Sequence, residues 1–415
     1  MLKRQAAVML LCASLILSSG CVSILEGEML SVSPHPVVPS EKPPENQREA
    51  SDYDELKSEI RDIVALHDNS DIIIIYSYDG DVQADVDRAC LEIKNNDPVG
   101  AYALSEITGT AARIVSRFEV VITPQYQRTK GQLSSVATVS TLPYLRNELL
   151  DAMEQYLDEA VFRTSLRSVT AKTVAGIVRE LYYQNPRRIV IMPGVVVEEF
   201  PENGSDRIVE VRFGNTVLEP GFLRLYGTTL TESIRINAEA AVGDNDAQIL
   251  LSLAENMIDS VVYDEGRAKR ISGHGSEDFA ATAYGALEAG SAVGEGFAMA
   301  YKALCDELSL GNRVVLGYLD GMVHAWNIVS LYGDNYHVDV SMCAQNGIET
   351  AFLKTDADFS RAGYTWDIEN TEKCSGSMTY RDVAVTETLQ SPSSAEAAEQ
   401  SDDTVDQRLS EPISG

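Results

Sequence analysis

The chain has 415 residues and a formal net charge of −30, from 63 acidic and 33 basic side chains. Its hydrophobic content of 44% and charged content of 23% are typical of globular protein, and its length allows two domains of ordinary size with tails. The acidic balance argues against a nucleic-acid binder, because no basic stripe is available to displace counterions from phosphates.

The first twenty residues predict an export signal. Lys3 and Arg4 precede an apolar run over 6–17, which is too short and too close to the N-terminus to favour a membrane-spanning helix. Small residues at 18–20 lead to Cys21, as at a bacterial lipoprotein cleavage site. A lipid on Cys21 would anchor the exported protein at the outer face of the cytoplasmic membrane. Cleavage without lipidation, giving a secreted protein, stays open.

Two segments have the composition of disordered chain. Residues 21–51 are rich in proline and polar side chains, which predicts an extended tether between the membrane and the folded part. Residues 384–415 contain mainly Ser, Glu, Asp, Ala and Gln, which predicts a disordered acidic tail.

Between these segments, residues 52–240 predict a separate α/β domain, because helical and strand-like hydrophobic spacings alternate along them. They contain no phosphate loop, dinucleotide fingerprint or catalytic constellation, so we expect a partner-binding or packing role. The expected helices cover 81–94, 99–118, 142–162 and 169–183, and the expected strands cover 71–78, 119–124, 188–193 and 207–213.

Residues 245–383 contain the residues that suggest chemistry. A glycine-rich turn over 290–296 precedes a helical pattern, and two strand-like segments then carry His324 and Asp339. In a hairpin whose two-residue turn is Tyr332–Gly333, Asp339 lies opposite Trp326, and its side chain shares a face with His324. Diagonal neighbours of this kind are within reach of an imidazole–carboxylate hydrogen bond, which would orient the imidazole toward the helix entrance.

A thiol at that entrance would be activated by the helix N-terminus and by the histidine, but the chain has Gly294 there. Cys305 lies roughly 16 Å further along, at 1.5 Å per residue. Ser291 precedes the helix and would need its own activation. His274, between two glycines, is expected to be an exposed loop residue.

The remaining cysteines do not suggest a metal site. Apart from the signal and Cys21, the chain has Cys90, Cys305, Cys343 and Cys374, without a CxxC motif or histidine-rich spacing. We expect no metal and no cofactor. If one disulfide forms, Cys343 with Cys374 is the expected pair.

The order and spacing of these segments resemble the transglutaminase-like superfamily, in particular its exported bacterial members with a papain-like Cys-His-Asp core. The resemblance implies an α+β fold for 245–383, with a helix packed on an antiparallel sheet. It also implies that Gly294 stands at the position of the nucleophilic cysteine, His324 at that of the base and Asp339 at that of the orienting acid. It is carried by residues 282–287, 292–298, 321–329 and 336–340.

Active members of that superfamily transfer or hydrolyse acyl groups at amide bonds, and loss of the nucleophile removes covalent catalysis. The first hypothesis is therefore an inactive domain that binds a peptide or cell-wall component in the former cleft. Two alternatives stay open: an acyltransferase or peptidase that uses another nucleophile or an activated water, with Ser291 or Glu295, and a purely structural surface lipoprotein. The residues expected to line the cleft are Glu295, Trp326, Tyr284 and Asn327.

Overall fold

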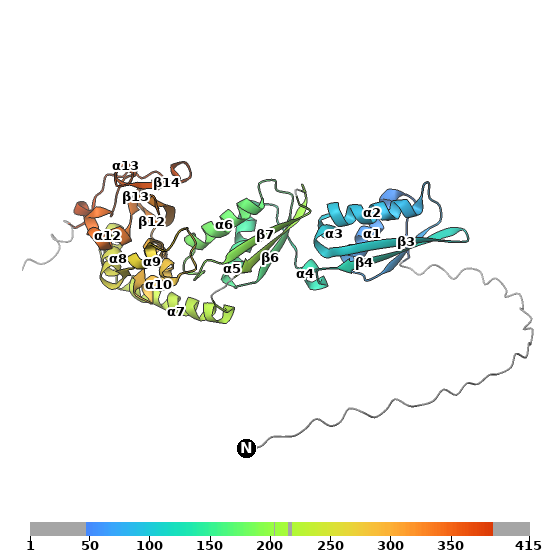
Figure 1. Ribbon diagram of the computed structural model, residues 1–415. Coiled ribbons are helices and arrows are strands. Elements are labelled where there is room, and N and C mark those ends of the chain that lie inside the picture. Colours follow the sequence, from blue (N-terminus) through green and yellow to red (C-terminus); the bar gives the residue numbers. More distant parts are fainter. Residues whose placement is uncertain (1–46, 203, 215–217, 385–415) are drawn as a thin grey trace, which may run out of the picture. The chain divides into compact units, whose positions relative to one another are not determined.

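The computed structural model describes residues 47–202, 204–214 and 218–384 (Figure 1). The predicted signal, Cys21, most of the tether and all of the acidic tail except Ala384 lie outside these residues. Within the described ranges, no helix is both long enough and apolar enough to cross a bilayer.

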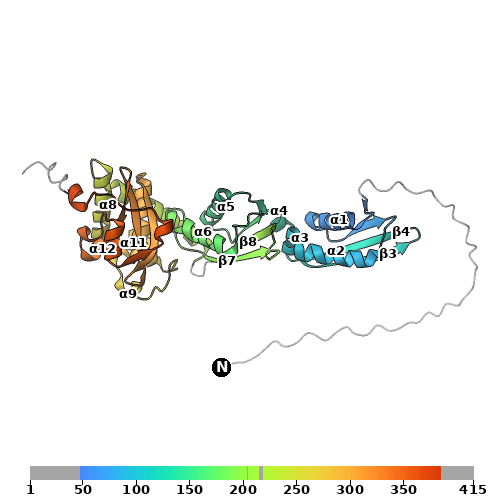
Figure 2. The ribbon, with the colours of Figure 1, turned by 90° about the horizontal axis from the view of Figure 1, so that it is seen from above.

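Residues 48–126, here called the first module, form a four-stranded sheet with helices on one face (Figures 1 and 2). The helices bury apolar side chains such as Leu56 and Val86 against alternate strand residues such as Ile73 and Val120. The strand order is β1-β2-β4-β3, with β1 parallel to β2 and the other pairs antiparallel. The elements are β1 (Arg48–Glu49), α1 (Tyr53–Leu66), β2 (Asp71–Ile75), α2 (Val82–Asn96), α3 (Pro98–Ala103), β3 (Leu104–Ile114) and β4 (Arg117–Tyr126).

Residues 137–214, here called the second module, form another four-stranded sheet after the short helix α4 (Lys130–Ser134). Its order is β5-β6-β8-β7, again with the first pair parallel and the others antiparallel. The elements are β5 (Ala137–Thr138), α5 (Leu142–Glu154), β6 (Glu159–Thr164), α6 (Ala171–Gln184), β7 (Gly194–Phe200) and β8 (Arg207–Gly214).

The two modules repeat one design at a constant offset. The N-caps of their first long helices are Asp52 and Thr141, and those of their second are Asp81 and Thr170, so both pairs differ by 89 positions (141 − 52 and 170 − 81). The central register pairs Ile73↔Val120 and Phe162↔Val209 differ by the same 89 positions (162 − 73 and 209 − 120). An identical strand order, pairing sense and offset define a tandem structural repeat.

This region differs from the sequence predictions in four places. It contains two sheets where one α/β domain was expected over 52–240. The helix expected over 99–118 is wrong beyond Ala103, because 104–114 form β3 with a strand-like alternation of burial. The helix expected over 142–162 is wrong beyond Glu154, because Glu159–Thr164 form β6. The strand expected over 188–193 is also wrong. Ile189, Val190 and Ile191 are all buried but pair with no strand, and a short apolar run does not by itself distinguish these states.

The C-terminal module is built around α11 (Gly294–Glu307), whose first twelve residues are all buried. Its sheet has the order β13-β12-β11-β14 and is antiparallel throughout. Helix α7 (Pro220–Glu239) lies inside the range expected for the N-terminal domain, but its Leu230 and Ile234 belong to the same buried cluster as Phe297 of α11. The other elements are α8 (Asp246–Ser260), β9 (Val262–Tyr263), α9 (Glu265–Ala268), η1 (Phe279–Ala281), α10 (Ala283–Leu287), β10 (Ser291–Ala292), β11 (Asn312–Leu319), β12 (Met322–Leu331), β13 (Asp334–Val338), α12 (Val340–Asn346), η2 (Ile348–Thr350), α13 (Asp356–Arg361), β14 (Tyr364–Trp366) and η3 (Ile368–Asn370).

The β12–β13 hairpin has the predicted register. Leu331 pairs with Asp334 across a two-residue turn at Tyr332–Gly333, and both turn residues have positive φ, 52° and 94°. This is the tight turn whose twist matches that of the flanking strands. The sequence of 350–354 also predicts a short strand, and this prediction is wrong, because Lys354 alone forms a bridge there, an isolated one with His337.

The repeated caps give a test of fold stability. Asp81 accepts a hydrogen bond from Ala84 N at 3.1 Å, and Thr170 accepts one from Thr173 N at 3.2 Å. Asp81→Ala and Thr170→Ala should each destabilise their module by about 0.5–2 kcal/mol, because an N-terminal N–H loses its partner. Hydrogen exchange of α2 and α6 measures this. The control is Thr229→Ala, because the hydroxyl of Thr229 caps no helix end and only donates to the carbonyl of Leu225 one turn earlier. Equal exchange in all three variants would contradict the capping role.

Candidate functional site

His324 and Asp339 form a buried pair at one end of the C-terminal sheet. His324 lies on β12, and Asp339 follows β13 directly and is the N-cap of α12. The distance from His324 Nε2 to Asp339 Oδ2 is 2.6 Å, and both side chains are buried. The hairpin register therefore brings together the two residues that the sequence placed on one face.

Asp339 is held by four donors. Its Oδ1 accepts from Ser341 Oγ at 2.7 Å and from Met342 N at 3.0 Å, and its Oδ2 accepts from Tyr364 Oη at 2.7 Å as well as from His324. Burial acts to raise the pKa of this carboxyl, but His324 and the hydroxyl donors outweigh burial and hold the pKa below its ordinary value. An ionised Asp339 accepts a hydrogen bond from the N–H at His324 Nε2. The other ring nitrogen, Nδ1, is then the acceptor of the imidazole.

The ring of His324 lies against Gly294, the first residue of α11. A Cβ placed on Gly294 would be 2.5 Å from His324 Cε1 and 2.6 Å from His324 Nδ1, closer than Cβ atoms approach other side chains. The φ of Gly294 is not in the left-handed region, so the helix itself does not require glycine here. Glycine is required by the imidazole, which occupies the space of a side chain at this position.

The other candidate nucleophiles are elsewhere. Cys305 is buried in α11, and burial raises the pKa of its thiol to about 12. Ser291 lies on β10, paired with Val262 of β9, and no described hydrogen bond joins it to His324. A buried, protonated thiol is not a nucleophile.

A second carboxylate–histidine pair was missed by sequence reasoning. Glu295 is buried at the start of α11 and its Oε1 is 2.8 Å from Nδ1 of His274, whereas its Oε2 has no hydrogen-bond partner. Burial, followed by the charge of Glu295, raises the pKa of both Tyr182 and Tyr183. The expectation of an exposed His274 is wrong, because this contact holds its ring half-buried. Only the contact of a distant loop with α11 reveals the pair, so no local pattern could have predicted it.

A groove of about 230 Å³ opens beside His324. Its walls come from the β11–β12 turn, from β9 and α9, and from α12. The residues that line it are Tyr263, Glu265, Ala268, Lys269, Leu319, Asp320, Met322, Val323, His324, Met342, Gln345 and Asn346.

The four residues expected to line the cleft are not in this lining. Trp326 is fully buried and donates from Nε1 to His337 Nδ1 at 3.0 Å, and Asn327 donates from Nδ2 to the carbonyl of Ala298 at 2.9 Å. Tyr284 packs on Tyr226. Glu295 points to His274 as described above. Nearness in sequence to Gly294 and His324 therefore did not predict which side chains face the groove.

Among the described residues, one group of side chains could hold a metal ion. It consists of His337, Asp356 and Cys374, whose potential ligand atoms lie within 4.8 Å of one another. The hydrogen bonds argue against a metal. Trp326 N–H can only donate, so His337 Nδ1 must accept and its Nε2 carries the hydrogen toward Asp356 Oδ1, 2.9 Å away. A nitrogen that carries a hydrogen has no lone pair for a metal. The cluster therefore ties β13 to the segment that begins at α13.

The expected disulfide is wrong. Cys343 and Cys374 are both free and buried, and so are Cys90 and Cys305. Cys343 Sγ donates to the carbonyl of Ile348, and Cys374 Sγ points to the carbonyl of Glu372. Each thiol thus fits its own packing environment.

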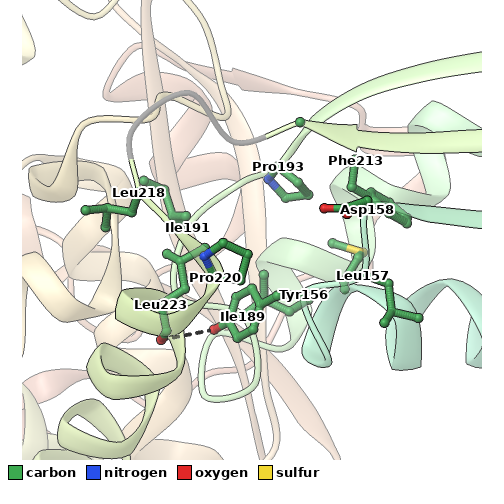
Figure 3. Close-up of a pocket in the computed structure, with 12 residues that line it drawn as sticks. Tyr156, Leu157, Asp158, Ile189, Ile191, Pro193, Phe213, Leu218, Pro220 and Leu223 are labelled. Atoms are coloured by element: carbon green, nitrogen blue, oxygen red, sulfur yellow. Dashed lines mark hydrogen bonds between the residues drawn. The ribbon is translucent and has the colours of Figure 1, made fainter.

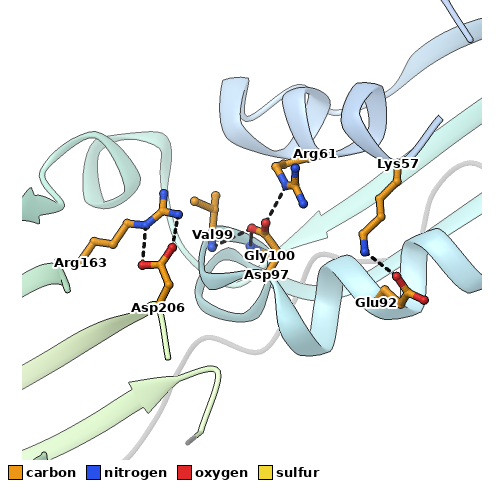
Figure 4. Close-up of polar contacts among 8 residues, drawn as sticks. All are labelled: Lys57, Arg61, Glu92, Asp97, Val99, Gly100, Arg163 and Asp206. Carbon is orange, nitrogen blue, oxygen red and sulfur yellow. Dashed lines mark hydrogen bonds and ion pairs between the residues drawn. The ribbon is translucent and has the colours of Figure 1, made fainter. Parts of the chain in front are cut away.

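Two further features away from the groove carry no catalytic arrangement. A mainly apolar cavity of about 110 Å³ includes Tyr156, whose hydroxyl donates to the carbonyl of Leu223 at 3.4 Å (Figure 3). Figure 4 shows the ion pairs Lys57–Glu92, Arg61–Asp97 and Arg163–Asp206, of which Asp97 also caps α3. These charges neutralise one another.

No protein-family model and no curated protein matches the sequence. Among solved structures, one described as the crystal structure of a TGase has 12% identity and a TM-score of 0.27, covering 64% of this chain and 71% of that chain. Another, described as a "Putative Cysteine Protease" from Cytophaga hutchinsonii, has 14% identity and a TM-score of 0.23, covering 50% of this chain and 73% of that chain. Similarities of this size do not assign a function to the chain.

The buried His337 gives a pH test. Burial lowers its pKa below the ordinary value of 6.5, although Asp356 opposes this. The unfolded chain therefore binds the proton more readily, so the stability contributed by neutral His337 is present above about pH 6.5 and lost as the pH falls through the native pKa. Between pH 7.5 and 5, the free energy of unfolding should fall by up to about 1.4 kcal/mol per pH unit for this proton.

Urea unfolding of wild type and His337→Gln measures the effect. Glutamine can accept from Trp326 and donate to Asp356 but does not titrate. The variant should show a flatter pH dependence over this window. Equal slopes would contradict a titrating His337.

Proposed function

We propose that residues 245–383 form a transglutaminase-like domain that has lost covalent catalysis and binds a peptide or cell-wall component in the groove beside His324. The observation that carries this proposal is the contact of the His324 ring with Gly294. It combines an oriented imidazole with the absence of both a nucleophile and the space for one.

Acyl transfer at an amide needs a nucleophile within reach of the base. Nδ1, the imidazole nitrogen left free by Asp339, faces the glycine at the start of α11. The ring itself fills the position that the Cβ of a side chain at 294 would occupy. The geometry therefore supports an inactive centre rather than a hydrolase with another nucleophile.

The groove supports a binding role. It combines apolar surface from Tyr263, Met322 and Met342 with polar groups at its rim, such as Asp320 and Gln345. Apolar walls with a few polar groups are typical of ligand sites, and methionine side chains adapt to varied ligands. Together with the export signal and the lipid anchor expected at Cys21, these features favour a ligand at the cell surface.

Binding and turnover can be measured on the same protein. We expect binding of purified cell-wall peptides in calorimetry, without amide hydrolysis or amine incorporation into a glutamine donor. Met322→Arg should weaken binding by about tenfold, because it places a charged side chain at the groove, and tenfold equals about 1.4 kcal/mol. Val115→Arg, at an exposed position in the first module, is the matched control.

Three outcomes would contradict binding without catalysis in this groove. Turnover that His324→Ala abolishes would show an active enzyme and contradict the proposal. Binding that both arginine variants weaken equally would place the ligand elsewhere. Absence of binding by every cell-wall peptide tested would favour a structural surface protein.

Gly294→Cys tests whether the rest of the site persists. The new side chain would have to displace the imidazole, and the thiol would then lie beside the shifted ring at a helix N-terminus, both of which lower a thiol pKa. We expect alkylation by iodoacetamide at pH 7, located by mass spectrometry, and a rate at least about tenfold lower when His324→Ala is added.

The native cysteines should react slowly with iodoacetamide at pH 7 and so should not obscure this measurement. Burial raises the pKa of Cys90, Cys305, Cys343 and Cys374 to about 12 in each case. A purely structural role for the His324–Asp339 pair would be favoured by either of two results: a thiol at 294 that is alkylated no faster than these four, or an alkylation rate that His324→Ala does not change.

A further inference from the structure

The groove beside His324 has one unpaired charge in its lining. The lining residues with a formal charge are Glu265, Lys269 and Asp320. Lys269 Nζ lies 2.7 Å from Glu265 Oε1, so these two charges neutralise each other. The carboxylate of Asp320 has no hydrogen bond or ion pair among the described residues. The lining therefore has a net charge of −1, from −1 for Glu265, +1 for Lys269 and −1 for Asp320.

The backbone fixes the position of the Asp320 carboxylate. Asp320 is the first residue of the two-residue turn between β11 and β12, with a φ of 50°, and its N–H donates to the carbonyl of Gly363 at 3.2 Å. Its Oδ1 occupies the space of a Cβ on Gly363, so the glycine leaves room for the carboxylate. A tight turn explains the choice of Asp followed by Gly, but not a fixed charge without a partner at the groove.

The wall formed by α12 adds two hydrogen-bond acceptors. Gln345 Nε2 donates to the carbonyl of Ser341 at 2.9 Å, and Asn346 Nδ2 donates to that of Met342 at 3.5 Å. A carbonyl can only accept, so each amide turns its nitrogen to the helix backbone. The amide oxygens Oε1 and Oδ1 are then left without a partner among the described residues. Two walls of the groove thus present acceptors that await a donor.

The rest of the lining suits an aliphatic stem. It contains Leu319, Met322, Val323, Met342 and the ring of Tyr263. A long cationic side chain covers apolar surface with its methylene groups while its charged head reaches polar groups beyond. Methionine side chains adapt to such a stem, and an aromatic ring offers a face to a planar cation.

We propose that the groove holds an arginine side chain of the peptide ligand, an assignment that rests on the function proposed above. A guanidinium has five N–H donors in a rigid plane, so it can pair with Asp320 and also reach the amide oxygens of α12. An ammonium has its three donors on one atom and is more strongly hydrated, so it fits acceptors on separate walls less well. An acidic side chain would meet the unpaired charge of Asp320 and be repelled.

Calorimetry on the full chain with capped tripeptides tests this assignment. The probes are acetyl-Ala-Arg-Ala-amide and the same peptide with lysine, citrulline or glutamate in place of arginine; citrulline keeps the shape of arginine without its charge. We expect the arginine peptide to bind at least about fivefold more tightly than each of the others, because it alone combines the charge with the planar donors. Its affinity should fall as salt is added, since the ion pair with an exposed aspartate is screened.

Asp320→Asn tests the contribution of the charge. Asparagine also tolerates positive φ, so the variant keeps the turn and loses only the carboxylate. It should abolish the preference for arginine over citrulline. The matched control is Asp334→Asn, at an exposed aspartate beside the other hairpin turn of the same sheet, which should leave that preference unchanged.

The outcomes separate this assignment from the proposed function. Equal affinities for arginine and citrulline, lysine binding as tight as arginine binding, or an arginine preference that survives Asp320→Asn would each overturn the assignment. If the arginine peptide does not bind while cell-wall peptides bind in a way that Met322→Arg weakens, the assignment fails and the proposed function stands. If no peptide of either kind binds, both fail.

Discussion

The arrangement of the C-terminal module depends on one buried carboxylate. Asp339 follows β13, caps the N-terminus of α12, and accepts hydrogen bonds from His324, Tyr364 and Ser341 and from one backbone N–H. Three elements, β12, α12 and β14, therefore meet at one side chain. Removing a single donor would leave a buried charge under-satisfied, which costs more than an ordinary hydrogen bond contributes. The His324 ring is therefore part of the packing of this module as well as part of the candidate site.

The sequence predicted those parts of the site that depend on residues close together along the chain. The parity of a two-residue hairpin fixes which side chains share a face, so the His324–Asp339 pair followed from the turn at Tyr332–Gly333. The position of Gly294 at a helix start followed from the glycine-rich turn before it. The close approach of the ring to Gly294 was not predictable, because it depends on how α11 crosses the sheet. The Glu295–His274 contact and the groove lining depend on the same long-range packing.

The N-terminal region illustrates a different limit. Residues 104–114 have alternating burial in the structure, but their small and polar side chains give a weak strand pattern in the sequence. The apolar run at 189–191 has the opposite character, since it is strongly hydrophobic yet lies outside any strand. The duplication was also hidden from the sequence, because helix caps of different residue type, Asp in one module and Thr in the other, perform one task. Repeats of this kind are preserved in backbone geometry rather than in residue identity.

The contact between Gly294 and His324 also bears on how such a site changes over evolutionary time. Because the imidazole occupies the space of a side chain at position 294, a substitution that places a thiol there enters a filled volume. Overpacking of this kind costs about 1–3 kcal/mol, and the strain falls on the hydrogen bond that holds the ring to Asp339. A side chain introduced at position 294 therefore lowers stability before it can contribute to any chemistry. Under the proposed function, this cost opposes the return of a nucleophile at this position.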